Sequence, residues 1–288
     1  MSLNGFAQQE PQYTQNQFNT MLMINPAYAG ANDYPSLGLR YRNQWLNLDG
    51  APSTLNLNGE TGIFSDKLGL GLAINHDKIG ILRNTSADLN IASHIQLNEK
   101  IKVGAGIKLG VDFLKSDFSL LTNVSASDPL YSDDKAAIPY IGIGGLLYSE
   151  LFYIGISSPR IASFENNSPQ TDISEPHFYL NGGYRFICKN GLEFRPAILG
   201  KYQNKAPFEM DFSLHVWYKE MVGFGAAYRT NDAVNFMVNT KLNRIILAYS
   251  YDMTVSGLRN YNTGSHEIHL GFEFGSKTPD RNENNRYF

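Results

Sequence analysis

The feature that most constrains this chain is an alternation of apolar and polar residues with a period of two, which recurs in short segments from Leu37 onward. Such alternation is typical of β-strands whose two faces meet different environments. Long amphipathic helical patterns do not occur over the same stretch. The alternating segments predict fourteen strands, at 36–45, 54–63, 68–77, 85–97, 101–114, 137–149, 151–158, 177–187, 192–202, 208–218, 221–230, 234–240, 244–251 and 265–274.

Composition narrows the class of all-β protein. Charged residues make up 18% of the 288 residues, against roughly 25% in an average soluble domain. Tyr and Phe are abundant, at 17 each, and the mean hydropathy is −0.29. No apolar run reaches the ~18 residues of a membrane-spanning helix. An outer-membrane barrel has this composition because half of each strand faces lipid and half faces a polar interior. A soluble β-sandwich also alternates, but its polar face would be richer in Lys, Glu and Thr.

The lengths of the connections favour the barrel. Odd-numbered strands are followed by the longer connections, at 46–53, 78–84, 115–136, 159–176, 203–207, 231–233 and 252–264. Even-numbered strands are followed by 64–67, 98–100, Glu150, 188–191, 219–220 and 241–243. The pattern predicts a single transmembrane antiparallel β-barrel with short periplasmic turns and longer extracellular loops. About fourteen strands are expected, with twelve and sixteen left open.

Four regions follow from this assignment. We expect a signal-peptide remnant at 1–7, a periplasmic N-terminal segment at 8–36, the barrel at 37–274 and a polar tail at 275–288. Gly5 and Ala7 stand at the −3 and −1 positions of a plausible signal-peptidase site, which predicts export through a cleaved signal peptide. A cloning tag or an ordinary flexible terminus is the alternative for the first seven residues.

Several apolar residues are candidates for binding a partner. Leaving the run Met21–Ile24 in water would cost roughly 1.5–3 kcal/mol per large side chain. We therefore expect this segment to be tucked into the periplasmic end of the barrel or docked on a partner there, and not to be a flexible leader. Trp45 lies at the outer end of the first predicted hairpin, where it is expected to support the barrel rim or to contact a partner. Ile161 and Phe164 fall in the predicted loop 159–176, where a lid over the lumen or contact with an exported protein is expected. The full candidate set is Met21, Leu22, Met23, Ile24, Trp45, Leu130, Tyr131, Ile161 and Phe164.

The polar faces of the strands place charged side chains toward the lumen. The predicted lumen-facing residues are Arg40, Arg42, Glu60, Lys108, Asp112, Glu193, Arg195, Lys201, Glu209, Asp211, His215, Arg229, Arg244 and Glu267. Their signs are mixed, whereas a selective porin usually presents one dominant sign. Mixed signs favour a cross-linked, mostly closed lumen.

Other function classes find little support in the residues. The net charge of −3 argues against nucleic-acid binding. A lone Cys188 excludes a disulfide framework and a zinc site built on cysteines. His266 and His269 are three apart in a strand and therefore point to opposite faces, so they cannot chelate one metal ion. No P-loop or nucleophile-elbow motif occurs. We therefore expect no enzyme activity, no metal and no cofactor.

Specific strings then point to a family. They include Gln12-Tyr13-Thr14-Gln15, Asn25-Pro26-Ala27-Tyr28-Ala29-Gly30, Gln44-Trp45-Leu46-Asn47-Leu48-Asp49-Gly50, Gly223-Phe224-Gly225-Ala226-Ala227-Tyr228-Arg229 and Gly264-Ser265-His266-Glu267. In this order they closely resemble the PorP/SprF family of type IX secretion system membrane proteins of Bacteroidetes. The resemblance covers about 12–274. It implies an outer-membrane barrel tied to the export of large adhesins and to gliding motility.

The leading hypothesis is therefore a non-enzymatic outer-membrane barrel of the type IX system that helps export, or anchors, a secreted cell-surface protein such as an adhesin. The resemblance also implies periplasmic ring or peptidoglycan-linked components as further partners, beside outer-membrane lipid. The alternative is an outer-membrane porin or hydrophobic-solute channel. A soluble β-sandwich binding module is a third reading.

Overall fold

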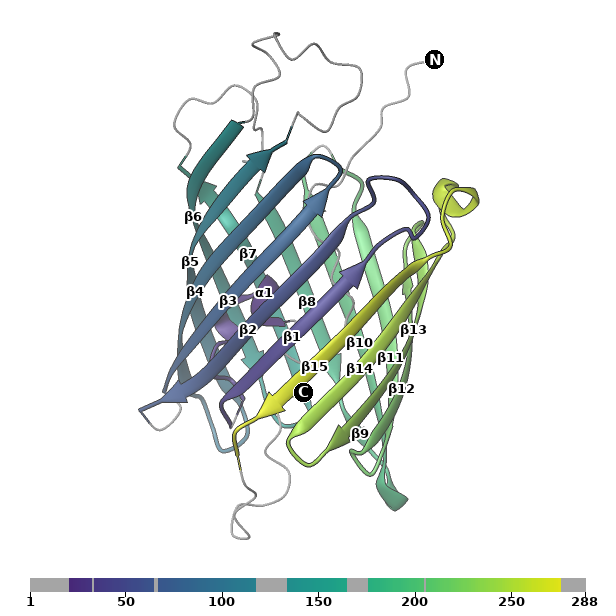
Figure 1. Cartoon of the computed structure of the whole chain (residues 1–288). Helices are drawn as coiled ribbons and strands as arrows, with labels where there is room; N and C mark the ends of the chain where they lie inside the picture. The colour runs from purple at the N-terminus through teal and green to yellow at the C-terminus, as the bar shows by residue number, and fades with distance from the viewer. Residues whose placement is uncertain are drawn as a thin grey trace, which may run out of the picture.

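The computed structural model describes residues 21–32, 34–64, 67–117, 134–164, 176–204 and 206–275. Its fifteen labelled strands form one antiparallel sheet, which closes because β1 pairs with both β2 and β15 (Figure 1). The strands are β1 (Ser36–Asn43), β2 (Ser53–Ile63), β3 (Leu68–Ile79), β4 (Leu82–Gln96), β5 (Lys102–Ser116), β6 (Asp134–Tyr148), β7 (Phe152–Ser163), β8 (His177–Tyr184), β9 (Phe186–Ile187), β10 (Leu192–Gln203), β11 (Glu209–Tyr218), β12 (Val222–Arg229), β13 (Ala233–Leu242), β14 (Ile245–Thr254) and β15 (Ser265–Glu273).

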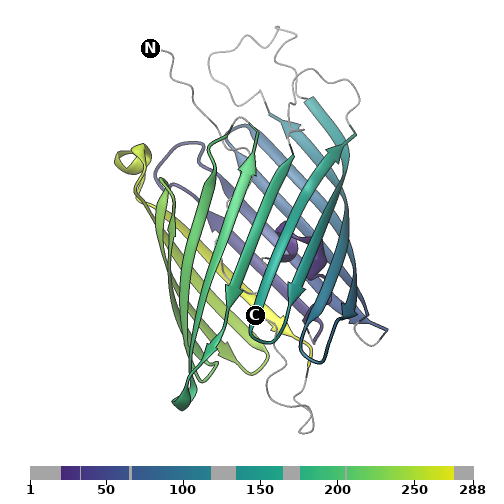
Figure 2. The same cartoon turned by 180° about the vertical axis from the view of Figure 1, so that it is seen from behind.

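Two of the labelled strands are parts of one. β8 and β9 both pair with β10 and are separated only by Arg185, so together they occupy a single position in the wall. The fifteen labels therefore fill fourteen positions, and the predicted fourteen-stranded antiparallel barrel is confirmed. Views from opposite sides show tilted strands surrounding one interior (Figures 1 and 2).

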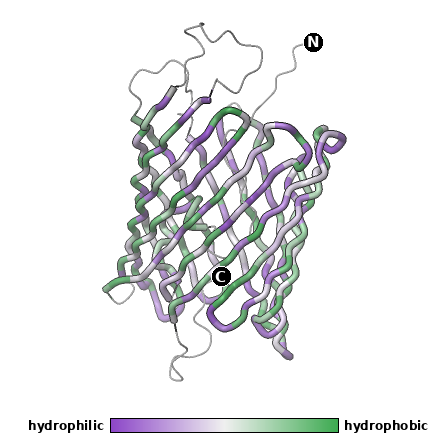
Figure 3. The backbone as a smooth tube through the Cα atoms, viewed as in Figure 1, coloured by the Kyte–Doolittle hydropathy of each residue, from purple (hydrophilic) through white to green (hydrophobic). Residues whose placement is uncertain are grey.

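The two faces of the wall have opposite chemistry. In β5, Ile107 and Leu109 point outward and are 48% and 45% exposed, while Lys108 between them is 2% exposed. The same alternation runs along the other strands (Figure 3). An apolar outer face and a polar inner face are what a sheet between lipid and a lumen requires. No helix among the described residues is long and apolar enough to span a bilayer.

Some strands extend further than the sequence pattern predicts. β7 continues through Pro159 to Ser163, so Ile161 lies in a strand and not in the predicted loop 159–176. A shift in register between Ile141 and Ile143 of β6 lies opposite Pro159 and lets pairing resume beyond it. Proline is tolerated in a sheet at such irregularities, which the period-2 pattern does not reveal.

Long and short connections lie at opposite ends of the barrel. The strand ends that flank the connections after β1, β5, β7, β10, β12 and β14 lie at the upper end in Figure 1, which we call the loop end. The 255–264 connection contains the 3-10 helix η5 (Gly257–Asn260). Turns of two to five residues lie at the opposite end, which we call the turn end, with η4 (Lys189–Gly191) in one of them. The predicted connection 78–84 is instead a tight turn at Gly80 and Ile81.

A short segment occupies the interior of the barrel. Residues 21–32, which we call the plug, contain the helical turn α1 (Met21–Ile24) and the 3-10 turn η1 (Pro26–Tyr28), and both views place α1 inside the wall. The apolar run Met-Leu-Met-Ile favours a helix, and Pro26 stops its continuation. Asn25 then caps η1 by accepting a hydrogen bond from the Ala27 backbone N–H.

Candidate functional site

The plug is held in place by polar side chains of the wall that bind its backbone. Lys108 Nζ donates to the Met23 carbonyl at 2.8 Å, and Ser157 Oγ donates to the Ile24 carbonyl at 2.7 Å. His94 Nε2 lies 2.8 Å from the Ala29 carbonyl oxygen. These contacts come from β5, β7 and β4, so the plug is bound to one side of the barrel. Hydrogen bonds to backbone groups satisfy peptide carbonyls that would otherwise be buried without partners.

Side chains of the plug complete the contact. The Asn25 Nδ2 donates to the Gly145 carbonyl at 3.1 Å, and the Tyr28 hydroxyl accepts a 2.9 Å hydrogen bond from Asn181 Nδ2. The Tyr28 ring meets Tyr153 edge-on, at 6.2 Å between centroids. Burial raises the pKa of Tyr28 well above its usual value, so this hydroxyl stays neutral. Near the turn end, Glu60 accepts hydrogen bonds from the Gly30 backbone N–H and from Asn32.

Inward-facing glycines make room for the plug. A Cβ atom on Gly69 would lie 1.8 Å from the Ala29 carbonyl oxygen, and one on Gly106 would lie 2.5 Å from the Ala27 nitrogen. On Gly144 it would lie 2.0 Å from Asn25 Oδ1. These approaches leave no space for any side chain. The glycines therefore form a groove in the inner wall, across β3, β5 and β6, that matches the backbone of the plug.

The lysine that binds the plug has its own buried counter-charge. Lys108 Nζ lies 3.2 Å from Asp88 Oδ2, and the other oxygen of Asp88 accepts a hydrogen bond from Tyr140. Buried charges are stable only when they are paired and hydrogen-bonded. The lysine therefore contacts a carbonyl of the plug and a carboxylate of the wall at the same time.

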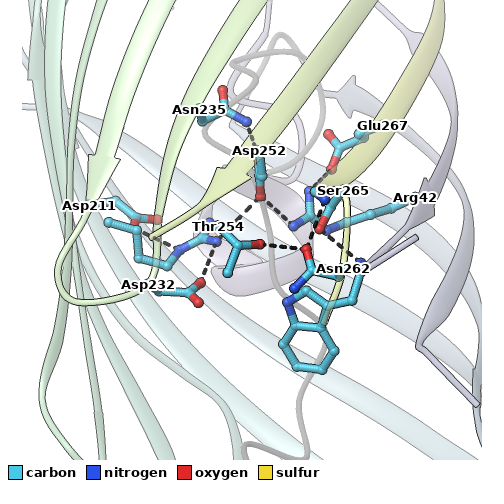
Figure 4. A network of polar contacts seen from close by, with 12 residues as sticks. Arg42, Asp211, Asp232, Asn235, Asp252, Thr254, Asn262, Ser265 and Glu267 are labelled. Carbon is cyan, nitrogen blue, oxygen red and sulfur yellow. Dashed lines mark hydrogen bonds and ion pairs between the residues drawn. The ribbon is translucent and has the colours of Figure 1, made fainter. Parts of the chain in front are cut away.

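The opposite side of the lumen is filled by a charge network. Asp252 Oδ2 lies 2.5 Å from Arg42 Nη2 and 3.5 Å from Arg229 Nη1 (Figure 4). Arg42 also contacts Glu267 at 3.4 Å, and Arg229 contacts Asp211 at 3.0 Å. These residues lie near the loop-end termini of β1, β11, β12, β14 and β15. The cations and anions compensate one another, so the network presents no single sign of charge to a passing ion.

Three further ion-pair groups line the inner wall. Glu193 is contacted at 2.5 Å by Arg185 and at 2.8 Å by Arg195, whose guanidinium carbon lies 5.3 Å from the centre of the Trp217 ring. Asp112 pairs with Arg160 of β7. Lys241 pairs with Glu273 at 2.5 Å. Ion pairs between strands therefore occur along the inner wall from the loop end to the turn end.

The structure buries the predicted lumen-facing side chains, with one exception. Those on the inner face and mostly or fully buried are Arg40, Arg42, Glu60, Lys108, Asp112, Glu193, Arg195, Lys201, Glu209, Asp211, His215, Arg229 and Glu267. The prediction for Arg244 is wrong. This residue is exposed in the two-residue turn between β13 and β14, because β14 begins one residue later than the pattern indicates.

The candidate partner-binding residues fall into separate places. Met21, Leu22, Met23 and Ile24 are all buried in the plug. Trp45 is half-buried at the loop end, where its backbone N–H donates to Ser265 Oγ at 3.1 Å. Ile161 is half-buried in β7, and Phe164, just after that strand, is 58% exposed. Leu130 and Tyr131 lie outside the described residues, as do 1–20 and 276–288.

Sequence reasoning missed several residues that hold the plug. Asp88 and His94 share the inner face of β4, and the alternation there was clear enough to have placed them. The paired inward glycines, Gly69 with Gly71 and Gly104 with Gly106, were a second unused signal. Inward positions without side chains leave room for another segment, and the apolar run at 21–24 was the available one.

The loop end carries a folded rim. The connection 44–52 is hydrogen-bonded to 255–264, through Leu46 N to the Gly264 carbonyl at 2.9 Å and Thr263 N to the Leu46 carbonyl at 3.0 Å. On its other side, Gly80 N donates to the Gly50 carbonyl at 2.9 Å. Tyr261 projects from this rim and is 67% exposed. The three connections therefore form one continuous surface.

Comparison with solved structures shows the fold. The toluene transporter TodX of Pseudomonas putida matches with a TM-score of 0.52 and 11% identity, over 89% of this chain and 93% of that one. Omp33, an outer membrane protein of Acinetobacter baumannii, matches with a TM-score of 0.47 and 6% identity, over 85% and 100%. CdiB of A. baumannii has the same TM-score at 10% identity, and the match covers 84% of this chain but only 60% of CdiB. The barrel is of the outer-membrane kind.

Sequence comparison identifies the family. No curated protein matches the sequence significantly. The family described as type IX secretion system membrane protein PorP/SprF matches residues 5–272, which is most of the chain. This agrees with the resemblance carried by the Asn-Pro-Ala-Tyr-Ala-Gly and Gly-Ser-His-Glu strings. The chain belongs to the PorP/SprF family of type IX secretion system membrane proteins, and it is a barrel of the outer membrane.

Proposed function

We propose that this protein is a non-enzymatic platform of the type IX secretion system, which helps export an adhesin-like surface protein or anchors it at the loop end. The observation that carries the proposal is the filled interior. The plug occupies the side of the lumen formed by β2 to β8, and the network around Asp252 occupies the other side. A polypeptide in transit would have to displace both, so contact with the exported protein belongs on the rim.

The rim has the properties of a docking surface. It is built from three connections on a closed barrel, in which 44–52 is hydrogen-bonded on one side to 255–264 and on the other to the turn at Gly80. Loops positioned by a rigid scaffold commonly carry binding function. Tyr261 offers a large exposed ring, and tyrosine is among the residues that contribute most to interfaces.

The turn end would face the periplasm. In outer-membrane barrels the short turns lie on that side, where periplasmic ring or peptidoglycan-linked components of the machinery would meet the protein. Delivery to this membrane would follow cleavage of an export signal.

The orientation is tested by the single natural cysteine. Cys188 is exposed in the turn between β9 and β10 at the turn end. A membrane-impermeant maleimide should therefore leave it unlabelled on intact cells and label it after lysis. In a Cys188→Ser background, Asn260→Cys in η5 should be labelled on intact cells. Labelling of Cys188 but not of Asn260→Cys on intact cells would invert the topology.

The proposed docking is tested by a matched pair of surface variants. The partner is first identified by deleting the gene and finding, by mass spectrometry, which protein is lost from the cell surface. Complementation with Tyr261→Ser should then recover markedly less of that protein at the surface than the wild type does. Tyr202→Ser, which alters an aromatic residue 52% exposed at the loop end of β10 but outside the rim, should restore it fully. If both variants restore equal amounts of the partner protein to the cell surface, the rim is not its docking site.

The alternative function, an outer-membrane porin or hydrophobic-solute channel, makes the opposite prediction for the purified protein. A channel needs a continuous open path through the lumen. Steady, large conductance of the wild-type barrel in a planar bilayer would support the channel and count against the platform.

A further inference from the structure

We infer that the inner wall contains a peptide-binding groove whose ligand is the protein's own segment 21–32, and that occupation of this groove is what closes the barrel to ions. The inference concerns permeability and stands apart from the identity of any exported partner. It rests on three features of the described residues: an asymmetry of the inner wall, the close match between the wall and the plug, and the hydrogen bonds that the wall makes to the plug backbone.

The first feature is the asymmetry. On the side formed by β10 to β15 and β1, long side chains such as Arg42, Arg195 and Arg229 reach into the lumen and pair with carboxylates there. On the side of β3 to β7, several inward positions are glycines instead, and what lies against them is the plug. Where the inward residues are glycines, the wall has no side chain to fill the space that the plug occupies. Removing the plug would therefore leave that space as an open path.

The second feature is how closely the groove fits the plug. Gly71 lies against Leu22, Gly144 against Asn25 and Gly106 against Ala27, so the groove follows the plug along its length. Leu22 and Ile24 are each 1% exposed, which shows how fully the apolar face of α1 is enclosed. A match of shape and apolar burial of this extent is how a protein recognises a specific peptide.

The third feature is that recognition is directed at backbone groups as well as side chains. Lys108, Ser157 and His94 contact three plug carbonyls within 2.8 Å, from three different strands. Backbone contacts position the peptide, and the contacts of Leu22 with Gly71 and of Tyr28 with Asn181 set its register. The plug pairs with no strand of the sheet, so the described wall closes without it. The groove should therefore bind the same peptide when it is supplied separately.

The experiment measures ion conductance of purified barrels in planar bilayers. The wild type should show almost no ion conductance. A variant lacking 21–32 should conduct at least about tenfold more, as expected when a constriction is removed from a pore. A synthetic peptide of sequence 21–32 should block the deletion variant, whereas a peptide of the same composition in shuffled order should not. Heat-modifiability on gels confirms in each case that the barrel is folded.

A pair of valine variants tests the groove in the full-length chain. A Cβ on Gly144 of β6 would enter the plug, at 2.0 Å from Asn25 Oδ1, whereas Ala105 of the neighbouring strand β5 is exposed on the outer face. Gly144→Val should displace the plug and raise conductance, and Ala105→Val should behave as the wild type. The added peptide should not block conductance of Gly144→Val, because the valine side chain occupies the part of the groove that binds Asn25.

Several outcomes would overturn the inference. It is wrong if the deletion variant and Gly144→Val fold but conduct no more than the wild type. It is also wrong if the wild type conducts as much as a folded deletion variant, or if the shuffled peptide blocks the deletion variant as well as the native sequence does. If both variants fail to form barrels while Ala105→Val succeeds, the segment is an integral part of the fold and not a separable ligand. Surface display of an exported protein is measured independently, so loss of the docking proposal leaves this result unaffected.

Discussion

Ala226→Arg should prevent stable assembly of the barrel, whereas Ala227→Arg, one residue further along β12, should be tolerated. Ala226 is exposed on the outer face, and Ala227 points inward. Arginine on the lipid-facing side of a barrel near the middle of the bilayer costs about 2–4 kcal/mol. At position 227 the guanidinium enters a lumen where Ser213 and Asn235 are the paired neighbours and carboxylates lie nearby.

The measurement is the fraction of folded protein in outer-membrane preparations, read from heat-modifiability on gels. The two substitutions are identical in chemistry and in strand, so a difference between them reports only the face. Equal folded fractions for both variants would mean that the inner and outer faces of β12 are assigned wrongly.

The second large effect is expected at Asp252, where neutralisation should strongly destabilise the barrel. Its carboxylate is shared by Arg42 and Arg229 and also accepts a hydrogen bond from Asn235. Removing one partner of a buried ion pair costs about 3–5 kcal/mol, because the remaining charge stays buried without compensation. The loss of stability in Asp252→Asn should lie near the lower end of this range. Glu267 still contacts Arg42 in the variant, and Asp211 still contacts Arg229.

Asp232 provides the control for this prediction. It contacts the same Arg229 at 3.3 Å, but its side chain is 28% exposed. Pairs that water reaches contribute about 0–1 kcal/mol, so Asp232→Asn should change stability little. Urea unfolding of the purified barrel in lipid vesicles measures both variants. A loss at Asp232 as large as that at Asp252 would show that burial is not what makes the network important.

The membrane-spanning architecture was readable from the sequence because it depends on a local pattern. Inward and outward residues alternate along every strand, so Ile107, Lys108 and Leu109 could be assigned to their faces without knowledge of any neighbouring strand. The number of strands and the placing of long and short connections at opposite ends followed from the same pattern. It failed where local irregularity intervenes, as at Pro159, and where a strand boundary decides the outcome, as at Arg244.

The sequence by itself thus determined a closed, two-faced barrel with charged residues inside it. Only the tertiary structure decided which of those charges meet, because Arg42 and Asp252 are 210 residues apart and come together through the closure of β1 on β15. Only the tertiary structure likewise decided that the apolar run 21–24 lies inside the barrel and not on a partner. The reason is physical: alternation is set by each strand's own backbone, whereas pairing across the lumen depends on the register of all fourteen strands together.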